Sequence, residues 1–143
     1  MATTTATINI SSDIISGAPI NISKTMTMNK LQSSIGLEET SGLRSKKFTD
    51  TAAVSIIEQD EYTNTKASKV YIRNTGSSSS DFFYVAKNAS AAAGDTAAVT
   101  IGRLYGGNWM LIPYLADVNI TVAPSTADTM TLEYMVFAED MLK

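Results

Sequence analysis

The stretch KVYIRNTGSSSSDFFYVAK, residues 69–87, joins two apolar segments through a short polar link. In its first half, Val70 and Ile72 alternate with Tyr71 and Arg73, which is the period of a half-buried β-strand. Its second half is rich in aromatic residues, which also favour a strand. The four serines between the halves bring no titratable group. The stretch therefore predicts a strand, a polar turn and a second strand, and a protein built as a surface rather than around a reactive loop.

Strand patterns of the same kind recur along the chain. TTTATINI and PINISKTMTM alternate apolar with small polar residues, and after residue 52 the segments AAVSIIE, NWMLIPY, DVNITVAP and TMTLEYMVFAED follow. Roughly eight to ten strands with turn residues about every ten positions are typical of an antiparallel sandwich. We therefore predict an all-β fold, an antiparallel β-sandwich or jelly roll with an extended N-terminal arm.

The later segments predict how individual strands are covered and connected. NWMLIPY is almost continuously apolar, as expected for a strand buried on both faces. Gly106–Gly107 predicts a hairpin turn between a strand ending at Tyr105 and another starting at Trp109. In the last segment, alternation places four apolar residues on one face of a strand: Met130, Leu132, Tyr134 and Val136.

The first fifty residues are expected to differ from the rest. Residues 29–51 have no clean period and predict a long loop, with a short helical turn near Leu37–Thr40. We therefore predict an N-terminal arm and loop region over residues 1–50, packed on or exchanged with neighbouring molecules. Residues 51–143 are predicted to form the sandwich core of a single domain, and the alanine-rich residues 89–93 a loop within it.

Composition excludes most kinds of chemistry. The 143 residues include no cysteine and no histidine, so Ser-His-Asp and Cys-His catalysis, His-ligated metals and thiolate sites are excluded. The net charge is −3, from 11 basic and 14 acidic residues, which argues against nucleic acid because phosphate binding needs a concentrated basic face. We expect no catalytic, metal or cofactor site and no nucleic-acid partner.

We expect neither a membrane-spanning helix nor a signal peptide. No stretch approaches the ~20 apolar residues of a membrane-spanning helix. MATTTATINI lacks the charged and apolar regions of a signal peptide, so we expect synthesis in the cytoplasm and no membrane partner.

Carboxylates are the catalytic groups that these exclusions leave. The runs Glu58–Glu61 and Glu139–Asp140 lack the spacing of a calcium loop and are expected to be a solvated turn and tail. A carboxylate-dependent hydrolase using Asp60 or Glu133 remains an alternative that no motif supports.

Adhesive residues are the stronger candidates. Aromatic residues gather in the second half, and alternation requires some to point outward from single strands. Burial in the core, a subunit interface or a carbohydrate-stacking platform are the alternatives for this group. The N-terminal strands carry residues that can bury against a neighbour or extend its sheet. The candidate interface residues are Thr5, Thr7, Ile8, Ile10, Met26, Met28, Tyr105 and Trp109.

Three segments of the second half resemble small β-sandwich structural proteins of tailed bacteriophages. These are IRNTG at Ile72–Gly76, the G-R-L…G…M-L-I-P pattern at Gly102–Pro113, and L-E-Y…F at Leu132–Phe137. The resemblance covers about residues 66–139, and its motifs are structural rather than catalytic.

The resemblance implies a virion component without enzymatic activity. Within the virion we expect a head decoration, or cement, protein that binds the major capsid protein on the outside of the shell and is assembled in the host cytoplasm. The resemblance also implies a homo-oligomer, dimer or trimer. A tail, connector or fibre component of the virion is the nearest alternative, and a carbohydrate-binding β-sandwich module is the alternative outside virions.

Overall fold

A computed structural model describes residues 3–13, 20–29, 36–59, 61–62, 67–87 and 100–140, all of them in strands or connecting segments. The chain divides into two compact units, one formed by Met1–Glu38 with Glu139–Lys143 and the other by Glu39–Ala138. The predicted all-β class is confirmed for the described residues.

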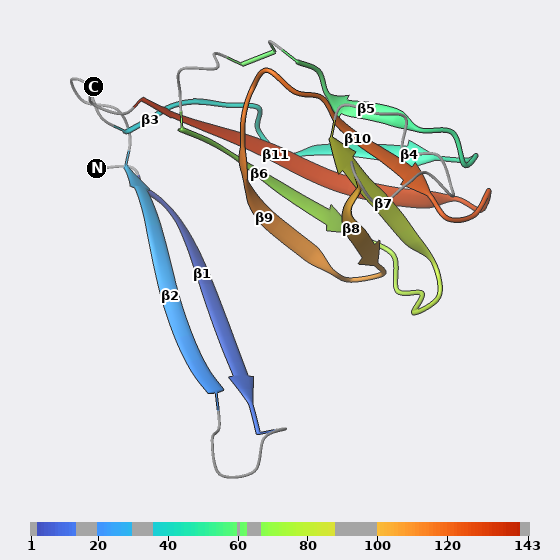
Figure 1. The fold of residues 1–143 in the computed structure, drawn as a ribbon, viewed down its shortest axis with the longest axis horizontal. Coiled ribbons are helices and arrows are strands. Elements are labelled where there is room, and N and C mark those ends of the chain that lie inside the picture. The colour runs from blue at the N-terminus through green and yellow to red at the C-terminus, as the bar shows by residue number, and fades with distance from the viewer. Residues whose placement is uncertain are drawn as a thin grey trace. The chain divides into compact units, whose positions relative to one another are not determined.

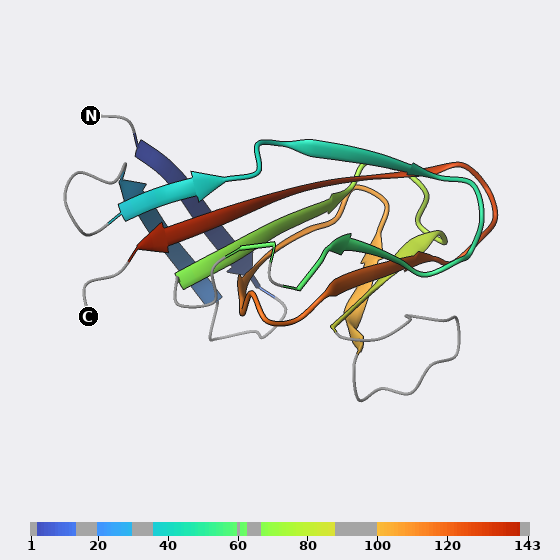
Figure 2. The ribbon, with the colours of Figure 1, turned by 90° about the horizontal axis from the view of Figure 1, so that it is seen from above.

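The strands from β3 (Gly36–Thr40) onward form two antiparallel sheets (Figures 1 and 2). The four-stranded sheet has the order β5 (Val54–Ile57), β10 (Ile120–Pro124), β7 (Phe82–Lys87) and β8 (Thr100–Tyr105). The five-stranded sheet has the order β3 (Gly36–Thr40), β11 (Met130–Asp140), β6 (Ala67–Asn74) and β9 (Trp109–Tyr114), and β4 (Arg44–Phe48) also pairs with β11.

The pairing of the strands is nested. From the outside inward, β4 pairs with β11, β5 with β10, β6 with β9 and β7 with β8, each pair antiparallel. Successive pairs lie in alternate sheets, so the connections after β4, β5, β6, β8, β9 and β10 pass from one sheet to the other. This is the arrangement of a jelly roll, the second of the two predicted forms of sandwich.

The core lies between the two sheets and is made by alternate residues of both. Ile72 and Leu132 from the five-stranded sheet and Phe83 and Val122 from the four-stranded sheet are fully buried. The predicted inward face of the last strand is confirmed, because Met130, Leu132, Tyr134 and Val136 all belong to this core. β10 departs from simple alternation: all five of its residues are buried, and Ala123 packs in a second small cluster with Ala86.

The region predicted as a loop supplies the first strand of the jelly roll. β3 replaces the predicted helical turn at Leu37–Thr40, and both β3 and β4 lie along β11. Between them, Ser41 keeps the ladder continuous: its N–H donates to Val136 O at 3.2 Å and its hydroxyl accepts from Val136 N at 2.9 Å. The larger unit begins at Glu39, whereas the sequence predicted a core starting at residue 51.

Two predictions about β9 are wrong. The strand lies at the edge of its sheet, with Trp109 and Pro113 exposed, so it is not covered on both faces. Proline is tolerated there because an edge strand leaves one row of N–H groups outside the ladder. Gly106–Gly107 does form a turn, with Asn108 N donating to Tyr105 O at 2.9 Å, but β8 and β9 belong to different sheets, so the turn is a corner and not a hairpin.

In the smaller unit, β1 (Thr3–Ser12) and β2 (Ile20–Asn29) form an antiparallel hairpin, hereafter the arm. Every residue of β1 has a partner in β2, from Thr3 opposite Asn29 to Ser12 opposite Ile20. The expected extended arm is therefore a paired ribbon, and the strands satisfy each other's backbone groups along the ladder.

Candidate interaction surfaces

The arm has two chemically different faces because residues directly opposite each other in an antiparallel pair point to the same side. One face is uncharged and polar: it carries Thr, Ser and Asn at every described position, and Thr7 pairs with Thr25 through their hydroxyls at 2.9 Å. On the same face Ser23 Oγ donates to Asn9 Oδ1 at 2.6 Å. These bonds join the two strands side chain to side chain on the polar face.

The other face of the arm is apolar, and its exposure increases along the ribbon. Met28 is 1% exposed and Met26 is half-buried, whereas Ile8, Ile10, Ile20 and Ile22 are 42–48% exposed. We call these four residues the isoleucine patch. Ile10 and Ile22 are directly opposed at the centre of the patch, and Ile8 and Ile20 lie on either side of them. Lys24, opposite Ile8, is the one charged residue among the ten paired positions of this face. The patch is therefore the part of the arm where the largest apolar side chains are exposed to water.

A third surface lies on the outer side of the five-stranded sheet. Val70 and Ile72 of β6 point into the core, so Tyr71 and Arg73 point outward, together with their partners Leu111 and Trp109 on β9. The Tyr71 and Trp109 rings are 6.4 Å apart, and Trp109 is 49% exposed. Arg73 approaches Glu133 of β11 at 3.8 Å. We call Tyr71, Arg73, Trp109, Leu111 and Glu133 the Trp109 face; its mixture of aromatic, Arg and aliphatic side chains is typical of protein interfaces.

Tyr105 lies elsewhere, on the outer side of the four-stranded sheet. Its ring stands 5.0 Å from that of Phe82, and the Arg103 guanidinium lies 4.9 Å from the Phe82 ring and 5.4 Å from the Tyr84 ring. The cation is thus already held by two rings of its own sheet. This cluster consequently stabilises the strand pair β7–β8 and leaves less aromatic surface for a partner.

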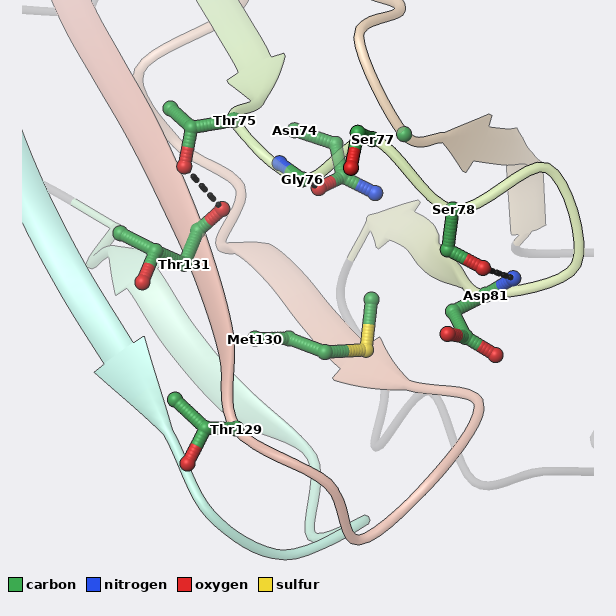
Figure 3. A pocket seen from close by; sticks show the side chains of 10 residues that line it. Asn74, Thr75, Gly76, Ser77, Ser78, Asp81, Thr129, Met130 and Thr131 are labelled. Carbon is green, nitrogen blue, oxygen red and sulfur yellow. Dashed lines mark hydrogen bonds between the residues drawn. The ribbon is translucent and has the colours of Figure 1, made fainter.

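The serine link between β6 and β7 forms one wall of an open polar pocket of about 370 Å³ (Figure 3). Two of the hydroxyls that line it are hydrogen-bonded to the backbone: Ser78 Oγ accepts from Asp81 N at 3.1 Å, and Thr75 Oγ1 donates to Thr131 O at 3.0 Å. Asp81 is the one charged residue of its lining. Its lining contains no paired acid and base, and Met130 is its one large apolar side chain. These features do not resemble those of a ligand-binding or catalytic pocket.

Asn74 ties this corner together. It is 1% exposed; its Oδ1 accepts from Gly76 N and its Nδ2 donates to Leu104 O, each at 3.0 Å. Its backbone bonds to Asn108 O and Gly107 N, also at 3.0 Å. The segments Ile72–Gly76 and Gly102–Pro113 therefore meet at the corner where the chain twice changes sheets, and Asn74 holds them together.

The predicted carboxylates form no reactive cluster among the residues described. Asp60 lies outside them. Glu133 faces Arg73, and Glu61 bonds to Arg44 at 2.9 Å, a hydrogen bond that raises the pKa of the Arg44 guanidinium. Within the described ranges no three acidic residues come together as metal ligands, and no helix is long and apolar enough to cross a membrane.

The eight predicted interface residues fall on four different surfaces. Thr5 and Thr7 lie on the polar face of the arm, Ile8, Ile10, Met26 and Met28 on its apolar face, Trp109 on its own face and Tyr105 in the Arg103 cluster. Sequence reasoning missed Ile20 and Ile22, although PINI repeats the pattern of TINI. Tyr71 was also missed, because its neighbour Trp109 is distant in sequence and comes close only through the pairing of β6 with β9.

Comparison of the chain with protein-family models, curated proteins and solved structures finds no match.

Proposed function

We propose that this chain is a non-enzymatic structural protein of a tailed-phage virion, most specifically a head decoration protein on the exterior of the major capsid shell. The observation that carries the proposal is the presence of two separate surfaces with exposed apolar or aromatic side chains, one on each compact unit. The isoleucine patch lies on the arm and the Trp109 face lies on the jelly roll. A protein that reinforces a shell has to hold more than one neighbour, and two surfaces allow that.

Physical reasoning links this design to cementing. Each surface is small, so a single contact would be weak. Many copies bound at once on a repeating lattice add their contacts and make the assembly strong. The buried core makes the jelly roll a rigid carrier for the Trp109 face. The phage-like motifs support the virion assignment, and a tail, connector or fibre position follows from the same properties.

The test is attachment to purified particles. Virions washed in high salt are analysed by quantitative mass spectrometry for the wild-type chain, for Trp109→Ala and for Ile101→Ala as the control. Ile101 is 43% exposed on β8 and lies on the other sheet. Because a central tryptophan commonly contributes ~2 kcal/mol or more to an interface, Trp109→Ala should lower occupancy about tenfold or more. Wild-type chain missing from washed particles, or equal loss with both variants, contradicts the proposal.

A carbohydrate-binding module is a second candidate, favoured by one observation. Trp109 offers an exposed ring beside Tyr71, and Arg73 and Glu133 next to them can hydrogen-bond to sugar hydroxyls. A glycan array comparing the wild-type chain with Trp109→Ala decides this point. Binding that Trp109→Ala abolishes supports the module, and no binding by either form rejects it.

A further inference from the structure

From the geometry of the arm, we infer that the isoleucine patch is a self-association surface, covered by the same patch of a second copy of this chain. The inference goes beyond the proposed function, because it concerns the purified protein and requires no virion. A negative result on particles leaves it intact, and a monomeric protein leaves the virion assignment intact.

The first step is that the patch needs a cover. An apolar sheet face is stable when another layer packs on it, and an isolated two-stranded hairpin is marginal in water. The arm is ten residue pairs long, and two cross-strand side-chain hydrogen bonds join the strands on its polar face. Four β-branched side chains that are each 42–48% exposed are therefore the unsatisfied part of this element.

The second step is that the patch fits its own copy. Ile10 and Ile22 are directly opposed at the centre, with Ile8 displaced to one end on β1 and Ile20 to the other end on β2. A two-fold axis through the centre of such a patch brings the same four side chains of both copies together in an isologous contact. Branched aliphatic side chains on two facing sheets interdigitate across about 10 Å, as in the core of a sandwich.

The third step concerns charge. Lys24 is the single charged residue on the paired positions of the apolar face, and it lies beside Ile8 at the margin of the patch. Its long side chain can turn its ammonium to water, so two copies meet without a buried like-charge pair. The apolar face has no row of charges that could attract a partner of opposite charge. An identical apolar face therefore fits it better than a charged surface of another protein.

The size of the patch predicts the strength of the contact. Four half-exposed isoleucines per copy are less than the ~800 Å² per partner of a standard stable interface. We therefore expect a dimer that is formed in a concentration-dependent way and dissociates on dilution, with a Kd in the micromolar range. Weak pairing of this kind is suited to molecules that a lattice already holds close together.

The first experiment measures the mass of the full chain by light scattering on a sizing column, from about 1 to about 100 µM. The wild-type mass should rise towards that of a dimer with concentration. Ile10→Thr combined with Ile22→Thr keeps β-branched residues and should raise the Kd at least about tenfold. Asn9→Thr combined with Ser23→Thr, an adjacent opposed pair on the polar face, is the control and should behave like the wild type.

The second experiment uses the absence of cysteine from the sequence, which makes any introduced thiol unique. Ile10→Cys and Ser11→Cys are neighbours on β1 that point to opposite faces. With a short bis-maleimide linker, Ile10→Cys should give several-fold more covalent dimer than Ser11→Cys. A wild-type monomer at every concentration, an unchanged Kd for the isoleucine double variant, or equal cross-linking at both positions overturns the inference.

Discussion

At the scale of single residues, the position of Gly106 explains why the link between β6 and β7 consists of small serines. A Cβ on Gly106 would lie 2.5 Å from Ser78 O and 2.7 Å from Ser78 N, while Gly106 N donates to Ser78 O at 3.1 Å. The link therefore rests backbone-to-backbone on the corner between β8 and β9. Small serines fit this contact, and the Ser78 hydroxyl accepts from the backbone N–H groups of Ser80 and Asp81 within the link.

This contact predicts the effect of Gly106→Ala. The clash is with rigid backbone and not with the end of a flexible side chain, so the variant should lose about 1–3 kcal/mol of unfolding free energy, measured by urea denaturation. Gly102→Ala is the matched control, because a Cβ there meets nothing within 4 Å, and its stability should stay close to that of the wild type. Equal effects of the two substitutions would refute the proposed contact.

A second residue-scale prediction concerns the opposed pair Ser68 and Tyr114. The Ser68 hydroxyl is buried and has no hydrogen-bond partner among the described residues, whereas Tyr114 OH donates to Val118 O at 2.9 Å. Ser68→Ala should therefore leave stability unchanged or raise it slightly, and Tyr114→Phe should lower it by about 1 kcal/mol. Urea denaturation of both variants checks the contrast, and a larger loss from Ser68→Ala would show that the hydroxyl is satisfied.

At the scale of elements, β4 shows that part of the region predicted as a loop is a strand that contributes to the core. Phe48 is 4% exposed, and its ring meets that of Phe83 edge-on with centroids 5.1 Å apart, which joins the two sheets. Residues 44–48 look like a charged loop because an edge strand sends several of its side chains to water: Arg44, Ser45 and Lys47 are exposed. Hydrophobic periodicity is consequently absent from the sequence there.

The membership of β4 in the core predicts a large effect of a single truncation. Phe48→Ala should cost about 3–5 kcal/mol of unfolding free energy, because it removes a buried ring between the sheets. Leu43→Ala, one residue before the same strand and 62% exposed, should change stability by no more than about 0.5 kcal/mol. If Phe48→Ala lowers the unfolding free energy only slightly in thermal or urea unfolding, residues 44–48 are not part of the core.

Local sequence could predict some elements and not others for physical reasons. The alternating faces of β6 and β11 were predictable because one face of each is buried and the other is not. The edge position of β9 was not, because an apolar run looks the same in a central strand and in an edge strand with exposed apolar side chains. Gly106–Gly107 marks a turn in any fold, but the sheet that the next strand joins depends on pairing with β6, far away in sequence.

At the scale of the whole molecule, the candidate surfaces were only partly predictable. Ile8, Ile10 and Trp109 could be proposed from exposed apolar character alone. Alternation along β1 already separates Thr5 and Thr7 from Ile8 and Ile10, but which residues of β2 join each face depends on the register of β1 with β2. The sequence contains no cysteine and no histidine, and two of the described carboxylates, Glu61 and Glu133, lie beside Arg44 and Arg73.

The central proposal, a structural role on the outside of a phage head, is tested most directly by imaging the particle. A reconstruction of the virion by electron microscopy should show the jelly roll as a repeated density on the shell exterior, with the Trp109 face against the major capsid protein. Particles lacking the chain should show a bare shell at those positions. A shell whose density is identical with and without the chain would contradict the proposal.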